Sequence, residues 1–262
     1  MKGKPVWAKG LSALQPWVQV LKNLNVAGDD RRTTDLIAQV FLAYAAEDQP
    51  NLDQENFACA AATVRALRQL LTQANISYWQ CPYPLPANGM EAEVVISRAT
   101  EACDNYVLVL SPRSLADACC LQGLLFALSM NKRIVPLLAE TVPTEHLPEP
   151  LQTLEMIHLQ SASPALGLSR GDRQLLQTLH HDADYHRAHT QLLVKALAWE
   201  RQRRDPALLL TGNPLDFYQR WLGLAQGRSH HRPIQLQALY VAESVRHAQA
   251  PPGIGWLRRW LE

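Results

Sequence analysis

The residues with the clearest potential for chemistry lie close together in the second half of the chain. Asp182, His186 and His189 follow one another at intervals of four and three residues, so one helical face would present all three. A carboxylate and two imidazoles in that arrangement suit Zn²⁺. The alternative is structural, because Asp182 and Asp184 stand where a helix would begin and where acids favour the N-terminus. The sequence favours the structural role, and we expect no metal ion.

The five cysteines offer a second possible chemistry: Cys59, Cys81, Cys103, Cys119 and Cys120. Their number is odd and no C-x-x-C spacing occurs, which predicts reduced thiols in the cytoplasm rather than a disulfide framework or a zinc site. The adjacent Cys119 and Cys120 could react with oxidants. We interpret them instead as small apolar residues on a buried helix, where free cysteines are commonly found.

The composition excludes several functional classes. The 262 residues carry 25 Lys and Arg against 24 Asp and Glu, which gives no reason to expect nucleic-acid binding. Hydrophobic residues make up 47%, enough for a packed core, and no apolar run is long enough to predict a transmembrane helix. No signal peptide is evident, so we expect a cytoplasmic location. Glycine-rich phosphate loops are absent, and Ser111–Ser114 lacks the glycines of a nucleophile elbow.

The pattern of apolar residues divides the chain into three regions. Residues 1–35 form an N-terminal extension with one short helix near Trp17–Leu24. Residues 36–165 alternate apolar runs with helical periodicity, which predicts βαβ units and a parallel sheet. The strands are predicted at Leu36–Tyr44, Ile76–Gln80, Tyr106–Leu110, Arg133–Leu138 and Met156–Leu159, and the helices at residues 53–73, 90–102, 115–130 and 146–153.

Residues 166–262 are predicted to form an all-helical C-terminal extension. The first helices run from about residue 171 to about Arg204, where Asp205-Pro206 interrupts them. Asn213 is predicted to cap the next helix, with Pro214 in its first turn. The last helix is predicted from Pro233 to about Gln249.

Four segments resemble motifs of the Toll/interleukin-1 receptor (TIR) family, in the order and spacing of that family. Val40–Asp48 resembles V-F-I-S-Y-S-x-E-D, and Leu85–Glu91 resembles the loop after the second strand. Ser111–Leu115 resembles the S-P-x-S-L turn, and Ala127–Leu138 resembles A-L-x-x-G-K-R-I-I-P-V. The resemblance, to a bacterial TIR protein, implies a flavodoxin-like sheet of five parallel strands in the order 2-1-3-4-5. Ligands of such sheets bind beyond the carboxyl ends of the strands.

TIR domains either cleave NAD or act only by self-association, and the resemblance places the deciding residue at Gly123. Cleaving members carry a glutamate on the third helix, in the pattern W-C-x-x-E-x-x-x-A-L. Aligning Cys120 and Ala127-Leu128 with that pattern places Gly123 at the glutamate position. Glycine has no side chain that could stabilise an oxocarbenium-like centre. Because the helix is apolar nearly all round, we expect another helix to cover Gly123 and fill the nicotinamide position.

Other positions of the implied pocket are also degenerate: Ala45, Ala46, Asn88 and Gly89. Asp117 lies six residues before Gly123, roughly 9 Å along a helix, and is expected to compensate the helix N-terminus. Glu91 and Glu93 are expected to do the same for the second helix, whereas Glu47 and Asp48 serve the turn after the first strand. None is a convincing substitute for the missing glutamate.

The sequence thus favours a signalling or scaffolding module that binds a protein partner or itself and needs no cofactor. The alternative is a TIR hydrolase of a bacterial defence or signalling system that cleaves NAD only when assembled. A third possibility is a subunit of a larger complex, bound through the Trp- and Arg-rich termini. From Phe217 to Leu261 six Arg stand against one acid, Glu243, so an acidic partner or peripheral contact with an anionic membrane is also possible. Asp182–Glu200 resembles segments that follow bacterial TIR domains, which supports its structural role.

Overall fold

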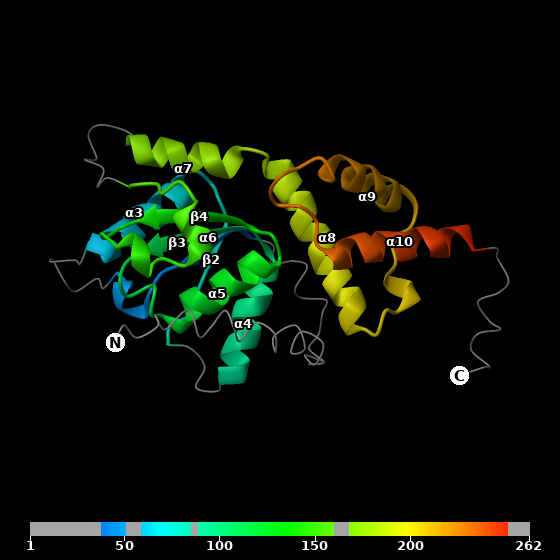
Figure 1. Ribbon diagram of the computed structural model, residues 1–262, viewed down its shortest axis with the longest axis horizontal. Coiled ribbons are helices and arrows are strands. Elements are labelled where there is room, and N and C mark those ends of the chain that lie inside the picture. The colour runs from blue at the N-terminus through cyan, green and yellow to red at the C-terminus, as the bar shows by residue number, and fades with distance from the viewer. Residues whose placement is uncertain (1–37, 51–58, 85–88, 160–167, 251–262) are drawn as a thin grey trace. The chain divides into compact units, whose positions relative to one another are not determined.

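The structure is a computed structural model, and it describes residues 38–50, 59–84, 89–159 and 168–250 (Figure 1). The expected helix near Trp17–Leu24 lies outside these residues. The chain divides into two compact units, Met1–Thr190 and Gln191–Glu262, which we describe separately. The predicted domain boundary near residue 165 also falls outside the described residues and stays a prediction. No helix in the described ranges is long and apolar enough to cross a membrane.

A parallel sheet forms the centre of the first unit. Its strands are β1 (Ala38–Ala43), β2 (Tyr78–Gln80), β3 (Cys103–Leu110) and β4 (Arg133–Leu138), in the order β2-β1-β3-β4. The register places Val40 opposite both Tyr78 and Asn105. Every residue of β3 is buried, which explains why the central strands read as continuous apolar runs rather than as alternating patterns.

The predicted fifth strand is wrong in extent, because the segment at Met156–Leu159 makes only one bridge to the sheet. Ile157 pairs with Leu137: its N–H donates to Pro136 O (3.0 Å) and its carbonyl accepts from Leu138 N (2.9 Å). The ladder cannot continue in one direction because Pro136 has no N–H. In the other direction the N–H of Glu140 already donates to Leu110 O at 3.2 Å. Ile157 thus lies beside β4, where a fifth strand would start.

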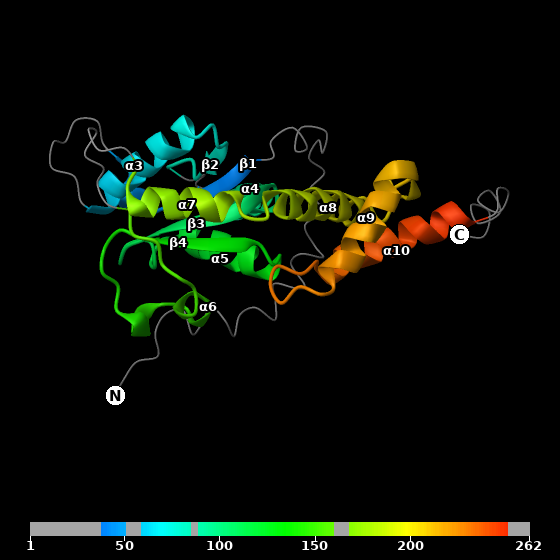
Figure 2. The same ribbon diagram turned by 90° about the horizontal axis from the view of Figure 1, so that it is seen from above.

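Helices cover both faces of the sheet (Figures 1 and 2). On one face, Phe41, Tyr106 and Leu108 pack with Ile96 and Leu124. These last two belong to α4 (Gly89–Glu101) and α5 (Ala118–Ser129). On the other face, the alternate strand residues pack against α3 (Cys59–Gln73) and α7 (Arg170–His180). The short elements of this unit are η2 (Ala46–Asp48), η3 (Thr144–His146) and α6 (Glu149–Gln152).

A buried lysine joins three segments at the amino end of the sheet. The Nζ of Lys132 donates to Glu101 O (2.9 Å), Cys103 O (2.8 Å) and Thr190 Oγ1 (2.9 Å). Thr190 lies on α8 (Ala183–Arg201). Burial lowers the pKa of Lys132 to about 8, although Cys103, Asp104 and Glu101 act in the opposite direction. The three hydrogen bonds therefore partly offset the cost of burying the charged ammonium group of Lys132.

This lowered pKa predicts an unusual pH dependence of stability. Between about pH 8 and about pH 10 the unfolded chain keeps the proton on Lys132 while the folded protein loses it. The unfolded state then binds more protons, so stability rises with pH. Relative to Lys132→Met, the native protein should gain about 2–3 kcal/mol over this range in urea denaturation. The exposed Lys195 is the control, and an equal gain relative to Lys195→Met would contradict the assignment to Lys132.

The second unit is entirely helical, as predicted for the described part of the C-terminal extension. It contains the end of α8, η4 (Pro206–Leu208), α9 (Gly212–Ala225) and α10 (Gln235–Gln249). The rings of Trp199 and Tyr240 pack with centroids 5.5 Å apart, and Tyr240 OH donates to Leu208 O at 2.6 Å. The predicted cap at Asn213 is wrong. Gly212, with a φ of 57°, already begins the helix, and Thr211 is the N-cap residue.

Candidate functional site

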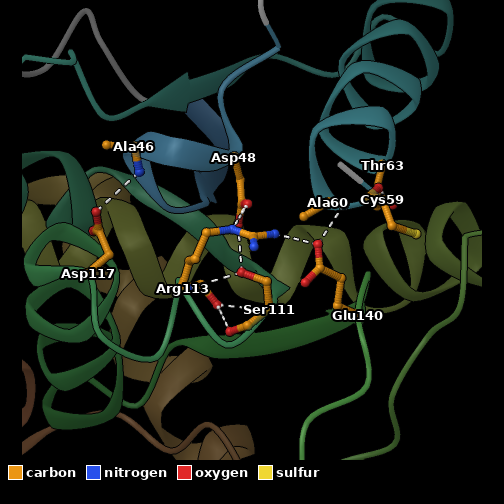
Figure 3. Close-up of polar contacts among 10 residues, drawn as sticks. Ala46, Asp48, Cys59, Ala60, Thr63, Ser111, Arg113, Asp117 and Glu140 are labelled. Carbon is orange, nitrogen blue, oxygen red and sulfur yellow. Dashed lines mark hydrogen bonds and ion pairs between the residues drawn. The ribbon is translucent and has the colours of Figure 1, made fainter. Parts of the chain in front are cut away.

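The loops that follow the four strands meet at the carboxyl edge of the sheet, and Figure 3 shows residues of the loops after β1, β3 and β4. Parallel strands end on the same side, so residues far apart in the sequence converge there. Tyr44–Asp48 follows β1, Cys81–Tyr83 follows β2, Ser111–Asp117 follows β3 and Glu140 follows β4. This is the edge at which the sequence predicts a ligand crevice.

A buried carboxylate, Asp48, organises this edge. Its exposed fraction is 0%, and it accepts hydrogen bonds from Ser111 Oγ and Arg113 Nε, both at 2.5 Å. The guanidinium of Arg113 also pairs with Glu140, whose Oε1 accepts from Ala60 N at 3.4 Å. The hydrogen bond to Asp48 is the main cause that raises the pKa of Arg113. Three strand-end loops and the start of α3 are thereby tied to one arginine.

The turn after β3 holds Arg113 in place through two reciprocal serines. Ser111 N donates to Ser114 Oγ (3.0 Å), and Ser114 N donates to Ser111 Oγ (3.1 Å). Both serines are buried, so the hydroxyls satisfy backbone groups that water cannot reach. The S-P-x-S spacing therefore encodes a closed turn, and the residue between proline and the second serine, Arg113, projects toward Asp48.

Replacing Asp48 tests this network. Asp48→Asn keeps the shape of the side chain but removes the charge opposite Arg113, and the free energy of unfolding should fall by about 1–2 kcal/mol. Chemical denaturation measures the change. The neighbouring Glu47 is exposed, so Glu47→Gln is a matched control that should leave stability within about 0.5 kcal/mol. Equal effects of the two substitutions would show that the ion pair does not stabilise the edge.

Asp117 lies at the N-terminus of α5, as predicted, but as its N-cap residue rather than inside the helix. Its carboxylate accepts from Cys120 N (3.0 Å), Ala46 N (3.3 Å) and Tyr83 OH (3.0 Å). Tyr83 OH also lies 2.9 Å from Tyr44 O, so its single proton is shared between two acceptors. Burial raises the pKa of Tyr83, with Cys120 and Asp117 adding to the effect, so the hydroxyl stays protonated. Both groups serve to join loops.

Gly123 faces the sheet at a very short distance from Tyr106. A Cβ at this position would lie 2.8 Å from both Cε2 and OH of Tyr106, closer than real Cβ atoms approach. Tyr106 OH donates to Cys120 O at 2.7 Å, and its ring packs on Phe41 with centroids 4.9 Å apart. The close approach expected at Gly123 is therefore present. Within the first unit it comes from Tyr106 of β3, and the predicted cover by another helix or a second chain stays a prediction.

A disulfide joins Cys81, after β2, to Cys119 in the first turn of α5. The prediction of reduced thiols is wrong for these two residues, because the fold brings together cysteines 38 positions apart that no short spacing could reveal. Cys59, Cys103 and Cys120 are free. Burial raises the pKa of the Cys103 thiol to about 12 and that of Cys120 well above its usual range. Cys119 and Cys120 are both buried on α5, as predicted, but only Cys120 is a free thiol.

The remaining pocket positions do not gather into one cluster. Ala45 is buried, whereas Ala46 is exposed and donates its N–H to Asp117. Gly89 begins α4, and a Cβ there would meet nothing within 4 Å. Asn88 lies outside the described residues. Glu91 and Glu47 are exposed in the first turns of α4 and η2, and burial raises the pKa of Glu93.

The three residues considered as metal ligands lie at the start of α8 and on it. Asp182 precedes α8 with a φ of 53°, and His186 and His189 are buried on that helix. Among the described residues, no group of three or more His, Cys, Asp or Glu could hold a metal ion.

Sequence reasoning missed Arg113, Glu140 and Tyr106. Two features could have indicated Arg113: its place inside the S-P-x-S turn, and the acidic residue Asp48 after β1. Nothing in the sequence indicated which residue would face Gly123.

Parts of this chain are similar to known proteins. A family model described as TIR domain matches residues 40–170. The TIR domain of the Toll-related receptor TRR-2 from Hydra magnipapillata is 18% identical, with a TM-score of 0.37, over 56% of this chain and 95% of that chain. A TIR-STING receptor from C. gigas, solved with 2',3'-cGAMP, is 20% identical, with a TM-score of 0.38, over 55% of this chain and 39% of that chain.

The receptor from C. gigas solved without that ligand matches at 20% identity and a TM-score of 0.36, over 55% of this chain and 40% of that chain. No curated protein matches the sequence. The family model spans half of the 262 residues. The chain belongs to the TIR domain family.

Proposed function

We propose that this chain is a signalling or scaffolding module that acts by self-association or by binding a protein partner, without cleaving NAD and without a cofactor. The carrying observation is the contact between Gly123 and Tyr106. The position that resembles the catalytic glutamate has no side chain, and a buried ring occupies the space that a side chain would need. No glutamate stands at this position, and the ring of Tyr106 packs so close to the backbone that only glycine fits there.

The other carboxylates at the carboxyl edge support this proposal. Asp48 and Glu140 are bound to Arg113, and Asp117 caps α5 and holds two further loops. A carboxylate that must stabilise a developing positive charge on a substrate cannot at the same time neutralise an internal arginine. These three carboxylates make their contacts within the fold.

Two measurements test the proposal on the purified full chain. Incubation with NAD at high protein concentration should release no nicotinamide, with an active TIR domain as positive control. Light scattering should reveal a defined oligomer, or a defined complex once a partner is supplied. Turnover well above that of a heat-inactivated sample would overturn the proposal.

The exposed Glu47 and Glu91 keep an alternative function in consideration: a hydrolase of a bacterial defence or signalling system that cleaves NAD only when assembled. Both lie in loops or first turns at the carboxyl edge, where a second chain could use them. In that case turnover should appear on assembly and disappear in Glu47→Gln or Glu91→Gln. Glu145→Gln, an exposed acid of η3, is the control. If NAD cleavage persisted in both variants, neither Glu47 nor Glu91 would be the catalytic carboxylate, and this alternative would be excluded.

A role as a subunit of a larger complex would use the Trp- and Arg-rich termini, which lie outside the described residues. Co-purification from the native host distinguishes this role from self-association. Stoichiometric companions that are lost when the termini are removed would support it.

A further inference from the structure

The helix α9 presents two large apolar side chains to solvent. Phe217 is 47% exposed and Leu224 is 80% exposed. They are seven residues apart, so they lie on the same side of the helix, two turns from each other. A Cβ at Gly223, the residue before Leu224 in the sequence, would also meet nothing within 4 Å. The buried residues of α9, Leu215, Tyr218, Trp221 and Ala225, form the face that adjoins this pair.

Basic residues accompany this apolar pair. Arg220 lies between Phe217 and Leu224 on the same side, and its Nε donates to the carbonyl of Asp216 at 3.2 Å, which keeps the guanidinium on the helix surface. Arg228 and Arg232 follow within two turns of the helix end. The second unit as a whole has ten Lys and Arg against five Asp and Glu, whereas the first has 15 against 19. The positive charge is therefore concentrated in the unit that carries the exposed apolar pair.

We infer that Phe217, Arg220 and Leu224, hereafter the α9 stripe, dock this unit on the surface of a membrane that contains anionic lipid. Apolar side chains that enter the boundary between headgroups and acyl chains, flanked by arginines that meet lipid phosphates, are the mark of interfacial helices. A second copy of the chain fits less well. Two side chains fall far short of the roughly 800 Å² that each partner of a stable complex buries. This inference does not depend on the proposed function.

The experiment is co-sedimentation of the full chain with vesicles of phosphatidylcholine alone or with about 30% phosphatidylserine. We expect binding to the anionic vesicles only, and weaker binding when salt is raised from about 50 to about 300 mM. Phe217→Ser combined with Leu224→Ser should weaken binding by about tenfold or more. The variant no longer gains free energy from moving two apolar side chains out of water into the membrane. Arg220→Gln should weaken it by about threefold or more.

Matched controls lie in the first unit. Leu168 is 48% exposed, close to the value of Phe217, and Arg170 is exposed, so Leu168→Ser and Arg170→Gln should bind as the native protein does. Circular dichroism and the unfolding midpoint check that each variant is folded.

Three results would overturn the inference: no preference for anionic vesicles, undiminished binding by the α9 variants, or loss of binding only in Trp256→Ser with Trp260→Ser. A dimer that the α9 substitutions dissociate, without any effect on vesicle binding, would assign the stripe to self-association instead.

Discussion

Gly123→Glu is expected to destabilise the protein by more than about 4 kcal/mol and to confer no NAD cleavage. The new Cβ would lie 2.8 Å from the ring of Tyr106, which is 1% exposed and packed on Phe41. Overpacking alone costs about 1–3 kcal/mol, and a carboxylate directed at a buried ring adds the cost of desolvation. Urea denaturation and nicotinamide release measure the two effects. A stable variant that cleaves NAD would show that Tyr106 moves freely.

Smaller substitutions isolate the contact from general effects on the helix. Gly123→Ala should still lower stability, although alanine normally favours helices by about 1 kcal/mol over glycine. Gly223→Ala in α9 is the control, because its Cβ would meet nothing within 4 Å, and it should raise stability slightly. In a double-mutant cycle, Tyr106→Leu should reduce the cost of Gly123→Ala. If the two substitutions lowered the free energy of unfolding by additive amounts, the contact between Gly123 and Tyr106 would not be the cause of the loss.

Removing the Cys81–Cys119 disulfide is the second change with a large expected effect. The bond closes a loop of 38 residues, and Cys81→Ala with Cys119→Ala should lower the free energy of unfolding by about 4 kcal/mol. The loss arises because the unfolded chain regains the entropy that the cross-link removed. Reductant should reproduce it in the native protein and leave the double variant unchanged. Urea denaturation with and without a dithiol measures this change in the free energy of unfolding.

The exposed Cys59 provides the control for this experiment, since Cys59→Ala should change stability by less than about 0.5 kcal/mol. Alkylation of the denatured, non-reduced protein followed by mass spectrometry should label three of the five cysteines. Labelling of all five would contradict the disulfide.

Much of the fold could be predicted because local patterns encode it. Arg133–Leu138 was expected as a strand and forms β4 with the same bounds. The apolar runs and helical periodicities also located α4, α5 and α10 to within a few residues. The fifth strand was overpredicted because its failure depends on hydrogen bonds elsewhere. Pro136 lacks an N–H, and Glu140 donates its own to Leu110. The spacing of apolar residues does not reveal which backbone groups already have hydrogen-bond partners.

The site was less predictable than the fold. That Asp117 acts at a helix N-terminus could be predicted, because such effects are local, whereas its role as N-cap depends on α5 beginning at Ala118 rather than at Leu115. The pairing of Asp48 with Arg113 joins residues 65 positions apart, and the disulfide joins residues 38 apart. Such contacts depend on how strand-end loops converge, which only the assembled sheet determines. Gly123 could be singled out from its motif, but its partner Tyr106 depends on the facing strand.

The fit between Gly123 and Tyr106 also limits the evolutionary paths open to this chain. A glutamate cannot replace Gly123 while the ring of Tyr106 occupies its space. Shrinking Tyr106 first would remove its hydrogen bond to Cys120 and leave a cavity against the helix backbone. Each single step therefore lowers stability. The pair therefore acts as an epistatic barrier, which keeps a lineage with this arrangement from acquiring the glutamate by one substitution.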